Sequence, residues 1–243
     1  MRPKVKTEAH QTKYLAELVC SNSFRSDDKE YNAVGVLHEE LRIADSLIMK
    51  TADYNKVPAG SALAVDRNNF SKEINETIKS IPNINVINQE VKNLTEFDNQ
   101  IVIVSTGPLT SKRLSENIKS KTSENSLAFY DAIAPIVYRE SINMSVAWKQ
   151  SRYDKGDGDD YINCPLSKEE YYQFLKQIKK APKMEFKNFE DTPFFEGCMP
   201  IEEIIRRGDE TLRYGPMKPI GLTNPHKNEE PYAVVQLRQD NKS

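Results

Sequence analysis

Cysteine is scarce in this chain, and its scarcity excludes a scaffold held together by disulfides. The 243 residues contain three cysteines, which are Cys20, Cys164 and Cys198. A disulfide framework needs several cysteines at close spacing, so we expect free thiols in a reducing compartment. A free thiol can act as a nucleophile, and the sequence around each cysteine therefore bears on function.

Long apolar runs are also missing. The longest, such as residues 101–104 (Ile-Val-Ile-Val), are far too short to span a bilayer. The first residues, Met1-Arg2-Pro3-Lys4, have no apolar stretch behind them, so we expect no secretory signal. With 38% hydrophobic and 29% charged residues, the composition is typical of a globular protein. We predict a cytoplasmic protein with no membrane partner.

A strong excess of basic charge is absent as well. The formal net charge is −2, so overall charge does not indicate a nucleic-acid partner, which would need a local basic face. Basic residues do gather in the last fifth of the chain and could contact phosphates or simply form a solvated face. They are Arg206, Arg207, Arg213, Lys218 and Arg238.

Metal and dinucleotide motifs are missing too. The three histidines share no metal-ligand spacing, so we predict no metal site. His38 stands beside Glu39 and Glu40, which predicts an exposed side chain. Gly156-Asp157-Gly158 lacks the third glycine and the preceding strand of a dinucleotide fingerprint. The acidic run 154–160 around it predicts a solvated turn.

Apolar periodicity predicts several helices. Residues 12–19 have helical spacing that runs into Cys20, and residues 37–48 form a second pattern. A third helix is predicted over 71–81, with Ser71 as its N-cap. Ser167 and Glu170 form a capping box, which predicts a helix to about residue 179.

The run 101–104 is β-branched and unbroken, as in a strand buried on both faces of a parallel sheet. A shorter strand is predicted at 85–87, and the whole is typical of an α/β fold. Ligands of such sheets lie beyond the strand ends, so Thr106 and Gly107 are candidate cofactor contacts, with a plain turn as the equal alternative. After about residue 128, aromatic residues and prolines become more frequent and the apolar alternation less regular. This change predicts a boundary near 128, which divides the chain into 1–128 and 129–243.

Cys198 precedes a predicted short helix from Pro200 to Arg207, which Gly208 would end. Unpaired amide groups at that helix start would favour the thiolate. The alternative is that Cys198 is a small buried hydrophobe.

Cys20 is predicted to end a helix, where the dipole disfavours a thiolate. The polar run Ser21-Asn22-Ser23 after it could bind a ligand or merely end the helix. Cys164 is expected to pack in the interior.

Several long strings together resemble one protein family, the folate- and flavin-dependent uracil-5 methyltransferases of bacterial tRNA, often called TrmFO. The resemblance covers essentially the whole chain in order. It lies in residues 1–3 (MRP), 17–23 (ELVCSNS), 32–35 (NAVG), 57–60 (VPAG), 63–67 (LAVDR), 105–111 (STGPLTS), 129–135 (FYDAIAP), 151–156 (SRYDKG), 161–165 (YINCP), 195–202 (FEGCMPIE), 214–219 (YGPMKP) and 231–241 (PYAVVQLRQDN).

The resemblance implies a Rossmann-like FAD-binding domain, present only in part, with an inserted α+β domain at 129–243. It implies FAD, 5,10-methylenetetrahydrofolate and NAD(P)H as cofactors, and the T-loop uridine of tRNA (uracil-54) as the methyl acceptor. The family's two functional cysteines fall on Cys20 and Cys198. We expect Cys198 to attack C6 of the base and Cys20 to be the partner thiol, which acts in proton removal or on the flavin adduct, although these roles could be exchanged.

The chain also departs from the family. The flavin fingerprint expected before Met1 is absent, and the family pattern continues beyond Asn241, so we expect an internal fragment. Activity would then need a complementing polypeptide. The alternatives are an inactive homologue that binds RNA or a partner protein, and an enzyme that acts on ribosomal RNA.

Overall fold

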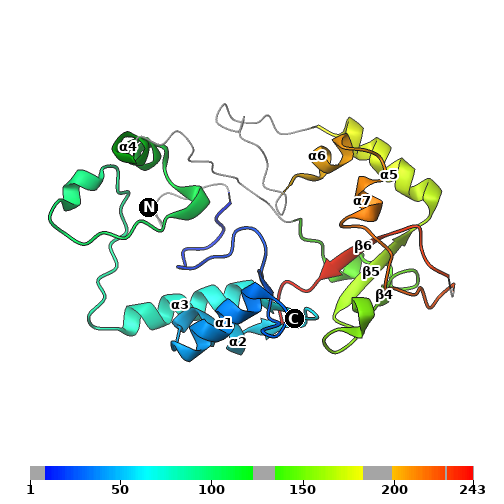
Figure 1. Ribbon diagram of the computed structural model, residues 1–243, viewed down its shortest axis with the longest axis horizontal. Helices are drawn as coiled ribbons and strands as arrows, with labels where there is room; N and C mark the ends of the chain where they lie inside the picture. The colour runs from blue at the N-terminus through cyan, green and yellow to red at the C-terminus, as the bar shows by residue number, and fades with distance from the viewer. Residues whose placement is uncertain (1–8, 123–134, 183–198, 228, 243) are drawn as a thin grey trace.

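The first of two small antiparallel sheets lies in the N-terminal part of the chain. The computed structural model describes residues 9–122, 135–182, 199–227 and 229–242. This sheet contains β1 (Ser23–Ser26), β2 (Lys56–Val57) and β3 (Ala62–Val65) in the order β1-β3-β2. Three helices accompany it: α1 (Ala33–Ile43), α2 (Leu47–Tyr54) and α3 (Arg67–Ser80) (Figure 1).

The first sheet and helices α1, α2 and α3 together form the first unit. Its core lies between the sheet and helices α2 and α3. Met49, Leu63 and Phe70 are almost fully buried, and Phe24 meets Phe70 edge to face at 5.4 Å between ring centres. Burial of such side chains is the main stabilising contribution to a unit of this size. The core therefore fixes how β1, and the chain just before it, lies against α3.

The second sheet comes from the C-terminal half. It contains β4 (Trp148–Lys149), β5 (Tyr161–Leu166) and β6 (Ala233–Arg238) in the order β4-β5-β6, again antiparallel. The helices beside it are α5 (Lys168–Lys180), α6 (Ile201–Arg206) and α7 (Thr211–Tyr214). A separate core forms around Tyr171, Leu175 and Leu212.

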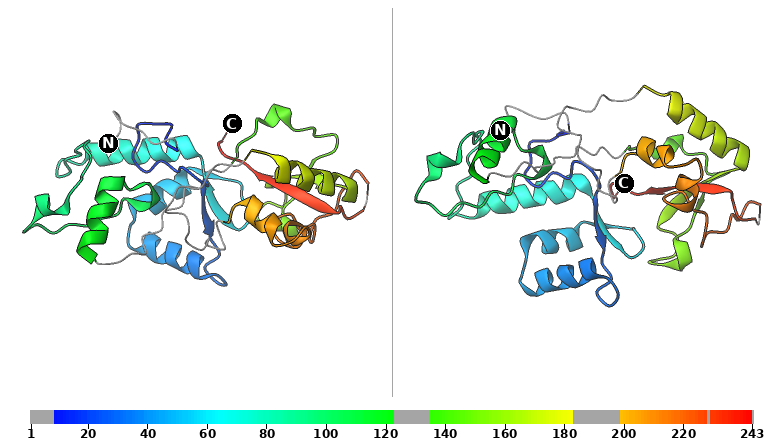
Figure 2. Two further views of the ribbon diagram at one scale, coloured as in Figure 1. Left: turned by 90° about the horizontal axis from the view of Figure 1, so that it is seen from above. Right: turned by 45° about the horizontal axis from the view of Figure 1, so that its top comes forward.

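The remaining elements are short. Helix α4 (Lys112–Thr122) lies apart from both sheets in Figure 1. Single 3-10 turns are η1 (Leu94–Phe97), η2 (Gly107–Leu109), η3 (Arg139–Ser141) and η4 (Arg152–Asp154). Figure 2 shows the two units from two further directions, with the end of the chain after β6 returning towards the first unit.

Two predicted helices are confirmed closely. The capping box of α5 is present: Ser167 Oγ accepts from the Glu170 amide at 3.2 Å and Glu170 Oε2 accepts from the Ser167 amide at 2.8 Å. Helix α6 forms where the sequence predicts it, with Pro200 at its N-cap and Gly208 just beyond its end.

The helix predicted over 12–19 is wrong. Ala16 has a left-handed backbone with φ of 54°, and Glu17 Oε1 accepts from the amides of Gln11 and Thr12 at 2.8 and 3.0 Å. The Glu17 carboxylate thus forms hydrogen bonds with backbone amides at the start of the segment, in competition with helical hydrogen bonding. The segment before Cys20 is irregular, and its apolar residues Ala16 and Leu18 pack against the first core without forming a helix.

Two other helices have different limits from those predicted. The pattern over 37–48 is split into α1 and α2 at Asp45, whose φ is 59°. Helix α3 begins at Arg67, because Asp66 Oδ1 accepts from the Asn69 amide at 2.9 Å as its N-cap. Ser71, the predicted cap, is buried inside the helix.

The parallel sheet predicted around 101–104 is not found among the described residues, and residues 85–87 form no strand. Ile101 is 100% exposed and Ile103 86%. A β-branched run suits a pleated, half-buried surface, but it forms a strand only when a partner strand lies beside it. The fold is mixed α/β with small antiparallel sheets. The boundary predicted near 128 lies outside the described residues.

Candidate functional site: the Cys20 loop

Cys20 lies in an irregular loop that leads directly into β1. Its side chain is half-buried. The guanidinium of Arg67 donates to the backbone carbonyls of Leu18 and Cys20, the latter at 3.0 Å. No helix ends at Cys20, so the unfavourable dipole that the sequence predicts there is absent.

Asn22 follows in the same loop and is buried. Its side-chain amide donates to the carbonyls of Val65 at 2.9 Å and Gln239 at 3.0 Å. Its Oδ1 accepts from Arg238 Nε at 3.1 Å. Asn22 therefore joins three segments: its own loop, the end of β3 and the chain after β6.

Ser21 and Ser23 are bonded locally as well. Ser21 Oγ accepts from Arg238 at 2.7 Å and from the Ser23 amide at 3.1 Å, and Ser23 Oγ accepts from the Arg25 amide at 3.0 Å. Burial lowers the pKa of Arg238. The polar side chains predicted to bind a cofactor thus make hydrogen bonds within the protein, and their cofactor role stays a prediction.

Thr106 and Gly107 lie in a different place, the exposed turn η2. Gly107 has a left-handed φ of 64° with open space around it. Thr106 Oγ1 and Thr110 Oγ1 lie 2.6 Å apart, and Thr110 Oγ1 donates to the Gly107 carbonyl at 2.7 Å. These contacts match the plain-turn alternative, and the strand expected before the turn is not formed.

The other two cysteines lie away from the Cys20 loop in the sequence. Cys198 lies outside the described residues. Cys164 is half-buried in β5, and burial raises the pKa of its thiol, which keeps it protonated and poorly nucleophilic. The prediction that Cys164 packs in the interior is met only in part, because its side chain is half-buried.

The predicted RNA-binding residues fall into two groups. Arg213 is engaged within the protein: its Nε donates to the Tyr232 carbonyl at 3.0 Å, and its guanidinium lies 4.3 Å from the Tyr232 ring centre. Arg206, Arg207 and Lys218 are exposed. The Nε of Arg206 is 2.8 Å from Glu203 Oε2, so part of its charge is balanced locally.

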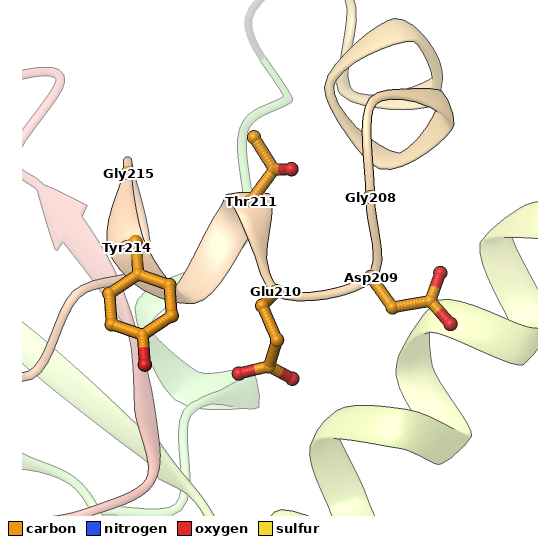
Figure 3. Close-up of a pocket in the computed structure, with 6 residues that line it drawn as sticks. All are labelled: Gly208, Asp209, Glu210, Thr211, Tyr214 and Gly215. Atoms are coloured by element: carbon orange, nitrogen blue, oxygen red, sulfur yellow. The ribbon is translucent and has the colours of Figure 1, made fainter.

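An open pocket of about 620 Å³ lies beside Arg213, along the segment from Gly208 to Gly215. Figure 3 shows the Tyr214 ring and the Glu210 carboxylate on the same side of this segment. Glu210 accepts from the hydroxyls of Tyr172 at 2.6 Å and Tyr232 at 3.0 Å, and the hydrogen bond from Tyr172 lowers the pKa of Glu210. The sequence predicted none of this cluster, since tyrosines 18 to 60 residues apart have no common spacing.

His38 is buried, whereas the sequence predicts it exposed. Its Nδ1 lies 2.9 Å from Asp27 Oδ1, and Arg42 donates to both oxygens of the same carboxylate at 3.0 and 2.9 Å. Arg42 also contacts Asp53 at 2.7 Å. The His38 side chain, on helix α1, points inward because the carboxylate of Asp27 lies there and contacts its ring.

The described residues offer neither a metal site nor a membrane-spanning helix. No group of three or more His, Cys, Asp or Glu side chains in them is arranged to hold a metal ion. None of their helices is both long and apolar enough to cross a bilayer.

The chain was compared with known proteins. The family described as glucose inhibited division protein A matches residues 1–243. The methylenetetrahydrofolate--tRNA-(uracil-5-)-methyltransferase TrmFO of Bartonella henselae is 58% identical over 247 residues, which cover 100% of this chain and 53% of that protein. Proteins with the same name from Bradyrhizobium diazoefficiens and Paramagnetospirillum magneticum are 58% and 57% identical and are covered over 52% and 54% of their lengths.

The chain thus spans about half the length of the curated relatives it matches. The family match extends from its first residue to its last. This protein belongs to the TrmFO/GidA family.

Proposed function

We propose that this chain is part of an enzyme that methylates C5 of a uridine in tRNA, with methylenetetrahydrofolate as the one-carbon donor. The observation that supports this most directly is 58% identity along the whole chain to a protein of that name. Since the chain spans about half of that relative, the activity belongs to the larger assembly, in the cytoplasm, that the chain would contribute to.

The chemistry requires an activated pyrimidine. C5 of uracil is a weak nucleophile until a thiolate adds at C6 and converts the ring to an enolate-like species. C5 then forms a bond to the methylene carbon of methylenetetrahydrofolate, a base removes the C5 proton, and the bond from that carbon to the folate nitrogen breaks so that tetrahydrofolate leaves. A hydride, of the kind that a reduced flavin would supply, must then convert the methylene to a methyl group as the thiolate leaves C6 and the C5–C6 double bond re-forms. Cys198 is the proposed C6 nucleophile and Cys20 the partner thiol that assists proton removal.

Cys20 suits such a role in its location. Its loop is held in place by hydrogen bonds, while its side chain is only half-buried. A thiol in a fixed but accessible place can meet a bound substrate with little reorganisation. Cys164, with its pKa raised by burial, is a less suitable nucleophile.

Flavin would supply the reducing equivalents, with NAD(P)H as their source. The described residues do not form a site for its pyrophosphate. They include no parallel strand that leads through a glycine-rich turn to a helix start. The pocket along 208–215 includes two acidic residues, Asp209 and Glu210, which disfavour an anion. Ser21–Ser23, Thr106 and Gly107 are therefore proposed only as secondary contacts to the cofactor.

The exposed basic residues are the proposed RNA contacts. Arg206, Arg207 and Lys218 could pair with phosphates, which position a nucleic acid without reading its sequence. Arg213 would act indirectly by holding Tyr232 and Tyr214 in place. These residues do not distinguish tRNA from ribosomal RNA, so tRNA is proposed on the relatives' names alone.

A second candidate is a catalytically silent protein that binds RNA or a complementing polypeptide. The absence of a pyrophosphate site among the described residues favours it over an enzyme that acts alone. The visible spectrum separates the two. A purified chain that takes up FAD and turns yellow supports standalone catalysis, whereas a colourless chain supports the need for a partner.

A chimera tests the proposed activity. The matching segment of the Bartonella henselae relative, to which the chain is 58% identical, would be replaced by this chain. We expect the chimera to form 5-methyluridine in tRNA that lacks it, in a reaction dependent on methylenetetrahydrofolate. A folded, flavin-loaded chimera without this activity would contradict the proposal.

The cysteine roles are tested in the same chimera with RNA that contains 5-fluorouridine, which traps the C6 adduct. Cys198→Ala should abolish the covalent adduct and Cys20→Ala should retain it. An adduct that persists in Cys198→Ala refutes the assignment of the nucleophile.

A further inference from the structure

Arg67 makes an unusual set of contacts for a side chain at the start of a helix. It is the first residue of α3, and its side chain is 16% exposed. One guanidinium nitrogen donates to the Leu18 carbonyl and another to the Cys20 carbonyl at 3.0 Å. Two residues of one loop are therefore held by a single planar group.

Asp240 fixes the other side of the same guanidinium. Its Oδ1 accepts from Nη2 of Arg67 at 2.8 Å and from Nε at 3.1 Å. The backbone amide of Arg67 also lies 3.4 Å from the Asp240 carbonyl. A guanidinium bound along one edge by a carboxylate has its remaining donors aimed in one direction, and here they point at the Cys20 loop.

A second arginine acts on the same loop from β6. Arg238 donates to Ser21 and Asn22, directly after Cys20. The loop itself forms no helix or strand between residues 9 and 22. Apart from hydrogen bonds within the loop, such as those that Glu17 accepts from Gln11 and Thr12, its conformation depends on contacts of this kind from outside.

We propose that Arg67, oriented by Asp240, is a positioning residue that sets the place of the Cys20 thiol. The importance of that position for methylation rests on the proposed function, but the positioning itself does not. Lysine in place of Arg67 keeps the positive charge, yet its single ammonium cannot contact Leu18, Cys20 and Asp240 in the same geometry.

The test is the alkylation rate of each cysteine in the 243-residue chain, measured by mass spectrometry of its peptides. Loss of about one net hydrogen bond from the loop should raise the Cys20 rate by roughly fivefold in Arg67→Lys. Asp240→Asn should act in the same direction. Cys164, in the second sheet, is the internal reference and should keep its rate.

Arg42→Lys is the matched control. Arg42 also forms hydrogen bonds with two carboxylates, Asp27 and Asp53, but with no described residue of the Cys20 loop. It should leave the Cys20 rate unchanged. An unchanged Cys20 rate in Arg67→Lys, or rates at Cys20 and Cys164 that rise together, would overturn the proposal, because the role would then be absent or only structural.

The link to catalysis has its own readout. In the chimera, Arg67→Lys should lower kcat with little change in KM for tRNA. If Cys20→Ala retains full activity, the proposed role of Cys20 in methylation fails, while the alkylation result still decides whether Arg67 positions the loop.

Discussion

The guanidinium of Arg67 and the carboxylate of Asp240 lie 2.8 Å apart, although 173 positions separate them in the chain. Around this pair, the Cys20 loop, the start of α3 and the segment after β6 meet. Asn22, which bonds to the Gln239 carbonyl, and Lys242, whose amide donates to Asp66 Oδ2 at 2.9 Å, join the same three segments. The end of the chain thus completes the surroundings of a residue near its beginning.

Removing the charge of Asp240 should destabilise the fold. Asp240→Asn keeps the size of the side chain but weakens a part-buried, charge-assisted bond, so we expect a loss of about 1–2 kcal/mol in the free energy of unfolding by urea. Glu116→Gln is the control, because Glu116 is 64% exposed in its pair with Lys112. Its effect should be within about 0.5 kcal/mol. Equal losses of unfolding free energy in the two variants would show that the Arg67–Asp240 pair stabilises the fold no more than an exposed ion pair does.

Asp27 should make stability depend on pH in the acid range. Burial opposes ionisation of this carboxyl, but hydrogen bonds from Arg42 and His38 outweigh burial and lower its pKa in the folded state. Its contribution to stability is therefore complete above the unfolded pKa of about 3.9, and it is lost as the pH falls from there through the lower folded value.

The variant Asp27→Asn should accordingly show a smaller drop in unfolding free energy between pH 6 and pH 3 than the parent, measured in urea at each pH. Asp45→Asn, at a residue 77% exposed beside Lys50, should leave that drop unchanged. A parent and an Asp27→Asn variant with the same pH dependence would contradict the assignment.

Two glycines in the loop 154–160 provide a matched pair. Both have left-handed φ values, 69° at Gly156 and 87° at Gly158. A Cβ at Gly156 would lie 2.7 Å from the Gly60 Cα, whereas one at Gly158 would meet nothing within 4 Å. Gly158→Ala should cost about 1 kcal/mol of backbone strain. Gly156→Ala should cost about 1–3 kcal/mol more.

The added cost at Gly156 would come from separating Gly60 from Asp160, whose Oδ2 accepts from the Gly60 amide at 2.5 Å. Urea midpoints of the two variants measure the difference. Identical midpoints would mean that the two segments do not pack as described.

The apolar run 101–104 should promote self-association. Ile101 and Ile103 are 100% and 86% exposed, and exposed apolar patches favour association. The double variant Ile101→Ser and Ile103→Ser should lower the associated fraction in sedimentation velocity, with an unfolding free energy changed by less than about 0.5 kcal/mol. Ile74→Ser, at a residue 1% exposed, should instead destabilise the protein strongly. A double variant that loses stability would show that the run is packed.

Local signals predicted several elements correctly. The capping box at Ser167 and the Pro200 to Gly208 pattern each need only residues within one helix, and both helices form as predicted. Helix α3 begins four residues before the predicted start, because Asp66 caps it through the Asn69 amide and Ser71 Oγ donates to the Arg67 carbonyl inside the helix. Sequence strings also indicated the family, which the match over residues 1–243 confirms.

The sequence by itself determined the family, the positions of the three cysteines and those helices whose ends depend on neighbouring residues. Tertiary structure alone decided that residues 101–104 remain exposed, that His38 is buried against Asp27, and that Arg67 and Asp240 hold the Cys20 loop. The reason is that strand pairing, burial of a charge and long-range hydrogen bonds depend on partners far away in the chain, which no local pattern specifies.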